Sequence, residues 1–386
     1  MIAQQAMEIK NLKKTAQRIL KAIKNKENII LYGDADLDGV TAVIILKETI
    51  KNLGGDVLAV YFPDREKEGY GINKEALSYL KKFAPGLLVA SDCGIGNFDE
   101  VILAKKLGFE VIIIDHHEVL DRLPRASIIV DPKQKGDIYP FKGLATVGIV
   151  FKLSEILLKN KMTDLLRKNF LELVALATLA DMMPQEEENK IMIEEGLSSL
   201  ENSWRPGLRA FFEINEFQNS GTIRMTAQKI ISALNSMEVK NHSNEGYLLL
   251  TSNSLEKAKT IAKSLLEKRY QKQIRIREIT DEVEEKALKE LDVPIIFEGD
   301  DSWPLTLAGS VASRICNLYK KPTFIFKKRE IESRGAVRTP PGINSVKTMK
   351  KCSKYLLTYG GHPQAAGFTI KNENLEEFKE CLIKNL

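Results

Sequence analysis

The chain has 386 residues, 44% of them hydrophobic and 28% charged, which is an ordinary globular composition with length for two or three domains. Its net charge of +5 permits a polyanionic partner without requiring one. No run of about 18 apolar residues predicts a membrane span, and the first residues show no secretory signal. We therefore expect a cytoplasmic protein without a membrane partner.

Short strand-like runs alternate with helical segments in the first part of the chain. An amphipathic helix is predicted from about residue 5 to 25. The expected strands are 29–32, 57–62, 87–90, 111–114 and 128–130, and the helices between them lie near 40–53, 74–83 and 98–107. This rhythm predicts βαβ units that build a parallel sheet.

The pattern changes after this region. Residues 146–200 are mainly helical, and breakers follow at Trp204-Arg205-Pro206-Gly207 and at Gly221. Residues 254–291 predict one charged helix, a spacer between domains rather than a core element. A second α/β pattern begins at Val293, with strands at 323–326 and 335–338. We expect a parallel-sheet domain over 1–200, a helical connector over 201–290 and a smaller α/β domain over 291–386.

Four cysteines are spread along the chain, at Cys93, Cys316, Cys352 and Cys381. Their spacing matches neither a zinc site nor a disulfide framework. We therefore expect four reduced thiols, as is usual for a cytoplasmic protein.

Acidic and imidazole side chains follow three of the apolar runs. They are Asp34, Asp36, Asp38, Asp92, Asp115, His116 and His117. Because the carboxyl ends of parallel strands meet at one crevice, these side chains should converge. A fourth candidate, Asp181, ends an apolar helical segment, where burial would make an unpartnered charge costly.

Each cluster also has an ordinary structural explanation. The aspartates at 34, 36 and 38 could be an acidic helix N-terminus, and Asp92 could be an N-cap. The histidine pair could be a surface or core feature. Asp181 could close a helix, although an acid is unfavourable beside the negative end of the helix dipole. Their combination favours a metal site, because oxygen and imidazole ligands suit Mn²⁺ or Mg²⁺, and two such ions form a phosphoryl-transfer site.

These clusters resemble the motifs of the DHH phosphoesterase superfamily. The matching strings are Asp34-Ala35-Asp36-Leu37-Asp38-Gly39, Ser91-Asp92-Cys93-Gly94, Asp115-His116-His117 and Ala180-Asp181. Residues 64–71, 131–134, 139–145, 205–208 and 311–314 resemble the RecJ-like exonucleases of that superfamily. Gly360-Gly361-His362 resembles the signature of the DHH-associated domain. The resemblance runs in family order over nearly the whole chain.

The resemblance implies a role for each matched residue. Two Mn²⁺ ions, or Mg²⁺, would be held by Asp36, Asp38, Asp92, His116 and Asp181, with Asp92 as the bridge. Asp34 would replace a histidine ligand that many family members carry upstream. His117 would face the scissile phosphate, next to Asp115. The substrate would be bound by Arg65, Arg314, Arg338, Gly360, Gly361 and His362, and the arginines at 65 and 338 would hold a 5′-terminal phosphate.

The chain departs from the RecJ-like pattern at several points. Ala336 stands where a phosphate-binding hydroxyl is expected, and an arginine-asparagine motif is degenerate over 229–235. A tryptophan-histidine-proline-glycine stretch has become Trp303-Pro304-Leu305-Thr306. The residues after the associated domain are too few for a nucleic-acid-binding OB domain. A replication or repair protein that supplies DNA binding is therefore an expected partner.

Three functions agree with these features. The first is a metal-dependent 5′→3′ exonuclease on single-stranded DNA, which the RecJ-like stretches favour. The second is a phosphodiesterase for short oligonucleotides or cyclic dinucleotides. The third is a catalytically silent replication scaffold, and the retained metal-ligand positions argue against it.

Overall fold

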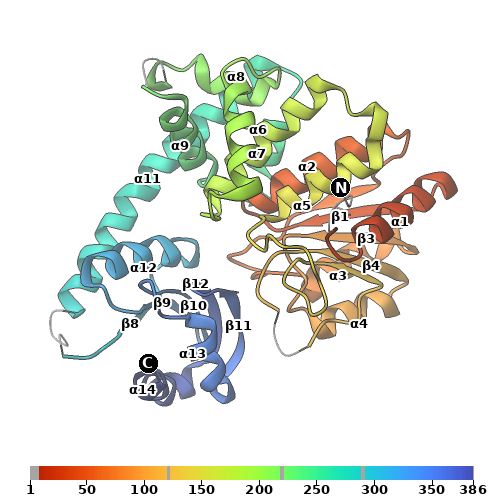
Figure 1. Ribbon diagram of the computed structural model, residues 1–386. Helices are drawn as coiled ribbons and strands as arrows, with labels where there is room; N and C mark the ends of the chain where they lie inside the picture. Colours follow the sequence, from red (N-terminus) through yellow and green to blue (C-terminus); the bar gives the residue numbers. More distant parts are fainter. Residues whose placement is uncertain (1–7, 120–121, 218–220, 288–291, 386) are drawn as a thin grey trace, which may run out of the picture. The chain divides into compact units, whose positions relative to one another are not determined.

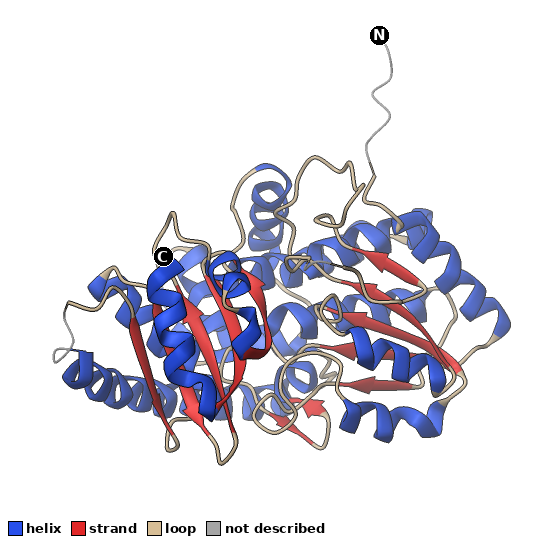
Figure 2. Ribbon diagram, turned by 90° about the horizontal axis from the view of Figure 1, so that it is seen from below, coloured by secondary structure: helices blue, strands red, loops and turns tan. Residues whose placement is uncertain are grey.

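The computed structural model describes residues 8–119, 122–217, 221–287 and 292–385. The chain divides into two compact units, Met1–Arg269 and Tyr270–Leu386. Each unit is built on its own five-stranded sheet with helices packed against it (Figures 1 and 2). The expected α/β fold class is thus confirmed, whereas the three-part division at residues 200 and 290 stays a prediction.

The sheet of the first unit is parallel, in the order β2-β1-β3-β4-β5. Its strands are β1 (Ile29–Gly33), β2 (Ala59–Tyr61), β3 (Gly86–Ser91), β4 (Phe109–Ile114) and β5 (Ile128–Val130). All five coincide with predicted strands. The register pairs Gly33 with Ser91, Ser91 with Ile114, and Ile114 with Val130. Four strands therefore end level with one another, which brings the segments that follow them to one edge.

Helices cover both faces of this sheet, which explains why its strands are apolar on both sides. One face carries α1 (Leu12–Asn25), α2 (Leu37–Asn52) and α5 (Thr146–Leu158), and the other carries α3 (Lys74–Leu80) and α4 (Phe98–Lys106) (Figure 1). Helix α2 is buried almost all round because it lies between the sheet and helices α5 and α6. The helix predicted from residue 5 begins at Leu12, and residues 1–7 lie outside the described part.

A helical layer completes the first unit. It contains α6 (Asp164–Ala180), α7 (Glu187–Leu200), α8 (Pro206–Phe212), α9 (Ile223–Leu234) and α10 (Glu245–Leu250), with an unpredicted hairpin of β6 (Val239–Lys240) and β7 (Ser243–Asn244). Buried Arg205, which directly precedes α8, links helices α6, α8 and α10 to helix α2, which packs on the parallel sheet. Its guanidinium donates to both carboxylate oxygens of Glu48 on α2 at 2.8 and 2.6 Å, and to Asn169 and the Leu250 carbonyl. Segments on either side of residue 200 therefore pack as one unit.

Buried Glu172 on α6 makes the stability of this layer depend on pH. Its Oε2 accepts a hydrogen bond from Ser203 Oγ, and burial raises its pKa from 4.5 to about 7. Because the folded pKa is the higher one, this stability is fully present below the unfolded pKa and is lost as pH rises through about 7. We expect Glu172→Gln to raise Tm by about 2–6 °C at pH 8 and to change it little at pH 4.5.

Thermal unfolding followed by circular dichroism at the two pH values measures this effect. Glu194→Gln on the exposed side of α7 is the matched control, since it removes the same charge without burial. Equal shifts of Tm for Glu172→Gln at both pH values would show that ionisation of this carboxyl does not cost stability.

Helix α11 (Leu255–Ala287) is the charged helix predicted for residues 254–291. Its apolar residues recur at helical spacing among the charges. Ala258, Ala262 and Leu265 are buried in the core of the first unit, and Ile279 and Val283 in that of the second. The expectation of a spacer outside the cores is therefore wrong, because sparse apolar positions suffice to make one buried stripe. Among the described residues, no helix is both long and apolar enough to cross a membrane, α11 included.

The second unit has a mixed sheet in the order β11-β12-β10-β9-β8. Its strands are β8 (Ile296–Asp300), β9 (Thr323–Lys328), β10 (Glu332–Arg338), β11 (Leu356–His362) and β12 (Ala365–Lys371). Only the pairing of β8 with β9 is parallel among these strands. Its α-helices after α11 are α12 (Leu305–Tyr319), α13 (Ser345–Lys351) and α14 (Leu375–Asn385). The predicted strands at 323–326 and 335–338 are confirmed, and β11 and β12 were not predicted.

Five single turns of 3-10 helix complete the described elements. They are Lys81–Phe83, Lys159–Lys161, Asn215–Phe217, Ser353–Tyr355 and Asn372–Asn374. The first of them extends α3 to the end of the helix predicted at 74–83.

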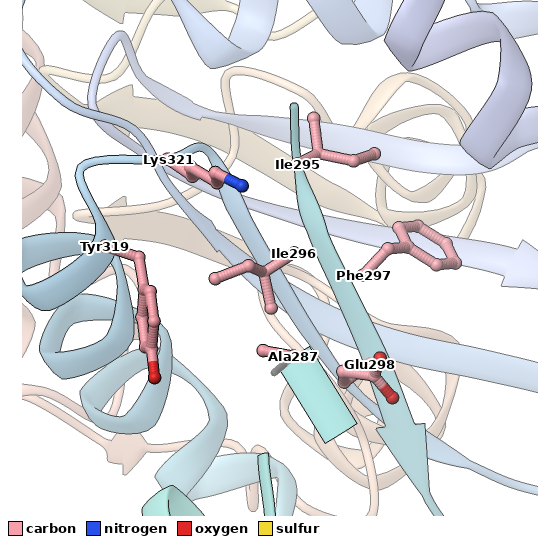
Figure 3. Close-up of a pocket in the computed structure, with 7 residues that line it drawn as sticks. All are labelled: Ala287, Ile295, Ile296, Phe297, Glu298, Tyr319 and Lys321. Atoms are coloured by element: carbon pink, nitrogen blue, oxygen red, sulfur yellow. The ribbon is translucent and has the colours of Figure 1, made fainter. Parts of the chain in front are cut away.

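The second unit contains a disulfide between Cys352, at the end of α13, and Cys381 on α14. The expectation of four reduced thiols is thus wrong for this pair, because folding brings together cysteines that are 29 positions apart. Cys93 and Cys316 are free and buried. A small depression in this unit is lined by Ala287, Ile295, Ile296, Phe297, Glu298, Tyr319 and Lys321 (Figure 3). It contains none of the candidate site residues.

Candidate metal centre

The backbone brings together the residues that follow β1, β3 and β4. The amide of Asp34 donates to the Ser91 carbonyl at 3.2 Å, and that of Asp92 to the Ile114 carbonyl at 2.9 Å. The amide of Asp115 donates to the Val130 carbonyl at 3.0 Å. The hydrogen-bonded ladder therefore continues one residue beyond each strand and sets three aspartates side by side. This is the convergence that the strand ends predict.

Two helix N-termini hold Asp36 and Asp38. Asp36 is the N-cap of α2, and its Oδ1 accepts a hydrogen bond from the Gly39 amide at 3.1 Å. Both oxygens of Asp38 accept hydrogen bonds from the first amides of α5, those of Thr146 and Val147, each at 2.7 Å. The capping explanation is thus correct for Asp36, and Asp38 is fixed by a helix that begins 108 residues later.

His116 lies among three carboxylates. Its Nε2 is 3.3 Å from Asp92 Oδ1, 3.4 Å from Asp181 Oδ2 and 3.7 Å from Asp38 Oδ2. The side chains of Asp38, Asp92 and His116 are almost completely buried, and their potential ligand atoms lie within 4.8 Å of one another. Asp181 reaches this group from the end of α6. Segments from four parts of the chain thus form one cluster.

The cluster carries more negative charge than the protein neutralises. Burial, followed by the charges of Asp181 and Asp36, raises the pKa of Asp38 well above its usual value. Burial and the neighbouring carboxylates likewise raise the pKa of Asp92, and that of Asp181 to about 7. Crowded carboxylates favour either protonation or a cation between them. Oxygen and imidazole donors fit divalent Mn²⁺ or Mg²⁺.

His117 and Asp115 form a second pair at the same edge. His117 Nδ1 is 2.8 Å from Asp115 Oδ1, and Asp115 Oδ2 accepts a hydrogen bond from the Ile95 amide at 3.1 Å. Burial would raise the pKa of Asp115, but the charge and hydrogen bond of His117 lower it overall. Burial would lower the pKa of His117, but Asp115 raises it overall. The pair therefore favours a charged imidazole beside the cluster.

Arg65 reaches the cluster from the loop after β2. Its Nε donates to Asp34 Oδ1 at 3.0 Å, and its Nη2 donates to Asp34 Oδ2 and, at 2.9 Å, to Asp36 Oδ2. The guanidinium lies 5.8 Å from the centre of the Tyr70 ring. Asp34, predicted as a metal ligand, thus contacts an arginine in this structure.

Three residues of this region had no predicted role. Thr146 Oγ1 donates to Asp92 Oδ1 at 3.1 Å, and Tyr70 donates to the Asp92 carbonyl at 3.0 Å. Buried Asp131 follows β5, and burial and the charge of Asp115 raise its pKa to about 8. The strand-end argument could have identified Asp131. No local pattern identifies Thr146, because its contact depends on how α5 packs.

The substrate-binding candidates after residue 269 lie in the second unit. Arg338 ends β10 and His362 ends β11, and both are opposite Ala365 of the intervening strand β12. Gly361 has φ 131°, and a Cβ there would lie 2.5 Å from the Ala365 carbonyl, so the position requires glycine. Gly360 belongs to the same strand rather than to a turn. Arg314 is exposed on α12.

Comparisons with known proteins agree with this arrangement. The N-terminal domain of the DHH family matches residues 28–178, and the DHHA1 domain matches residues 292–386. The single-stranded-DNA-specific exonuclease RecJ of Bacillus subtilis is 34% identical over 97% of this chain and 48% of its own length. RecJ of Thermus thermophilus is 28% identical over 97% of this chain and 54% of its own length. The chain thus spans about half the length of these two curated relatives.

Solved structures show the same fold. A crystal structure of exonuclease RecJ bound to manganese is 26% identical, with a TM-score of 0.77, and the match covers 98% of this chain and 95% of that one. Thermus thermophilus RecJ in complex with Mn²⁺ has a TM-score of 0.81 at 24% identity, over 99% of this chain and 55% of that one.

The parallel sheet with acidic and imidazole residues at its strand ends, together with the two matched domains, defines a DHH-type protein. The chain carries the N-terminal domain of the DHH family and a DHHA1 domain, and nearly its whole length is similar to RecJ.

Proposed function

We propose that the protein is a metal-dependent phosphodiesterase that degrades single-stranded DNA from its 5′ end. One structural observation carries this proposal. Asp38, Asp92 and His116 are almost completely buried, and with Asp181 from the end of α6 they form a strongly acidic cluster. Burying such charges costs folding free energy, so the cluster favours a catalytic site over a silent scaffold. The relatives that share both domains are named as single-stranded-DNA-specific exonucleases.

The residues proposed to hold two Mn²⁺ or Mg²⁺ ions are Asp36, Asp38, Asp92, His116 and Asp181. When bound, such ions activate water and stabilise the charge that develops on a phosphate. Hydrogen bonds within the protein orient two of these carboxylates even without a bound ion. The two α5 amides orient the carboxylate of Asp38, and Thr146 orients that of Asp92.

His117 and Asp115 are proposed to handle the proton of the reaction. Asp115 is anchored by the Ile95 and His116 amides and contacts His117 Nδ1, so it fixes the imidazole ring and favours its charged form. A charged imidazole next to the scissile phosphate can donate a proton to the leaving oxygen. Asp115 would act through His117, as a positioning residue.

The substrate contacts are proposed from the family pattern. Each of Arg65 and Arg338 is assigned to the 5′-terminal phosphate, because a guanidinium binds phosphate oxygens with directed hydrogen bonds. Arg314, Gly360, Gly361 and His362 are assigned to the nucleotide. A DNA substrate implies a cytoplasmic site of action, and a replication or repair protein that presents single strands is the proposed partner.

We expect the enzyme to prefer a strand with a 5′-phosphate over the same strand with a 5′-hydroxyl. A terminal phosphate carries charge that an internal one lacks, and Arg65 would lower KM for that end. Digestion of the two strands, each labelled at its 3′ end, in Mn²⁺ and after removal of metal by EDTA measures the preference. The same assay measures whether hydrolysis requires a metal.

Two results would contradict the proposal. Equal rates on both strands, or mononucleotides released first from the 3′ end, would favour a phosphodiesterase of short oligonucleotides. Absence of bound metal and of hydrolysis would favour the silent scaffold.

A further inference from the structure

Asp34 has one of the most constrained positions in the candidate centre. Its side chain is about 1% exposed, and its amide extends the ladder between β1 and β3. Gly39 of α2 packs directly on its backbone. A Cβ at Gly39 would lie 2.5 Å from the Asp34 carbonyl oxygen and 2.7 Å from its nitrogen. The carboxylate of Asp34 is thus a fixed point at the end of the sheet.

Both oxygens of this carboxylate face a single guanidinium. Arg65 Nε donates to Oδ1 at 3.0 Å, and Nη2 donates to Oδ2. This side-on pair of charge-assisted hydrogen bonds is the geometry that only arginine provides. The pair uses Nε and Nη2 of Arg65. Among the described residues, none accepts a hydrogen bond from Nη1 of Arg65. The side chain of Arg65 remains 37% exposed, so the guanidinium is both held and accessible.

The loop that carries Arg65 is anchored separately. Glu68 accepts hydrogen bonds from the Asp64 amide at 3.0 Å and from the Tyr61 hydroxyl at 2.7 Å. Asn73 donates to the same carboxylate at 3.1 Å. Glu68 thus fixes the backbone of this loop, and Asp34 fixes the far end of the arginine side chain. Without Asp34, the long side chain would regain rotamer freedom that binding a phosphate must then remove.

We propose that Asp34 is a positioning residue for Arg65 and not a metal ligand, so that it aims the guanidinium at the terminal phosphate of the substrate. This inference rests on the proposed function. A carboxylate whose two oxygens already accept from a guanidinium is a poor ligand for a second cation, because the two positive charges would repel each other within a buried site. Asp36 differs, because it gives Arg65 a single contact and is 37% exposed. It can bind a metal without loss of the Asp34–Arg65 pair.

The test compares Asp34→Asn, Arg65→Lys and the double variant with wild type. Mn²⁺ binding is measured by calorimetry, and hydrolysis on strands with a 5′-phosphate or a 5′-hydroxyl. We expect all three variants to bind the wild-type number of Mn²⁺ ions with affinity within about threefold. We expect their preference for the 5′-phosphate to fall about tenfold, the scale of a lost charge-assisted hydrogen bond. The double variant should lose no more than either single one, because the two residues act as one unit.

Arg65→Lys tests the geometry of the pair separately from its charge, because lysine keeps the positive charge but cannot make the side-on pair of hydrogen bonds. Lys67→Ala, in the same loop and 82% exposed, is the matched control and should leave the preference unchanged. Loss of one Mn²⁺ ion in Asp34→Asn would overturn the inference and make Asp34 a ligand. Equal losses on both strands, with no change in preference, would also overturn it.

These outcomes are separable from failure of the proposed function. A wild-type protein that binds Mn²⁺ but does not digest single strands overturns the function, and the Mn²⁺ titration of Asp34→Asn still decides whether Asp34 is a ligand. A wild-type protein that binds no Mn²⁺ overturns both.

Discussion

Replacing Asp92 with asparagine should lower hydrolysis by about 10³-fold or more while the protein stays folded. Asp92 lies with Asp38 and His116 in a group of buried side chains that could hold a cation. As the proposed bridge, it would contribute charge to both metal positions. An amide in its place retains the shape and removes that charge.

Asparagine is the correct substitution because of the backbone at this position. Asp92 has φ 65°, a left-handed conformation that aspartate and asparagine adopt more readily than alanine does. Alanine would add strain of about 1 kcal/mol, so its effect would mix folding with chemistry. Asparagine can also still accept the hydrogen bond from Thr146 Oγ1.

The metal-free variant should be at least as stable as wild type at pH 8. Burial, with the charges of Asp36 and Asp38, raises the folded pKa of Asp92 well above 3.8. A raised carboxyl pKa means that stability is fully present below the unfolded pKa and is lost as pH rises through the folded one. Asp92→Asn removes this loss. Added Mn²⁺ should then raise Tm of wild type more than that of the variant.

Turnover and thermal unfolding with and without Mn²⁺ measure both parts of this prediction. Wild-type turnover of Asp92→Asn at saturating Mn²⁺ would refute the assignment of Asp92 to the metal centre. A metal-free variant that unfolds below wild type at pH 8 would refute the electrostatic argument alone.

Replacing His117 with alanine should lower hydrolysis of DNA by about 10²–10⁴-fold, the range of a general acid or base. The structure supports this role through Asp115, which is completely buried and contacts His117 Nδ1 at 2.8 Å. His117 itself is 18% exposed, so solvent and substrate can reach the ring. Asp115→Asn should cause a smaller loss, because asparagine can still orient the ring but no longer favours its charge.

A substrate whose leaving group needs no protonation distinguishes proton donation by His117 from the other roles of this residue. Thymidine 5′-monophosphate p-nitrophenyl ester releases a phenolate that leaves without protonation. We expect His117→Ala to lose less than about tenfold on this ester, while its Mn²⁺ binding stays like that of wild type. Equal losses on the ester and on DNA would mean that His117 binds the phosphate and donates no proton.

The sequence alone determined the parallel sheet and the positions of its strand ends. Short runs such as residues 87–90 and 111–114 are apolar because both faces of each strand are covered, and this property is visible in neighbouring residues. The rule that parallel strands end at one edge then placed Asp34, Asp92 and Asp115 together. The same reasoning failed for β11 and β12, which contain Gly360, Gly361 and Gly367 and are less apolar.

Only the tertiary structure decided which side chains meet within the centre. The sequence placed Asp34 among possible metal ligands, and it could not show that folding sets this carboxylate against Arg65, 31 residues away. It likewise could not show that amides at the start of α5 hold Asp38, or that Cys352 pairs with Cys381. Burial and helical periodicity are properties of adjacent residues, so they can be seen in a local pattern. The partner of a charge depends on the packing of distant segments, which no local pattern contains.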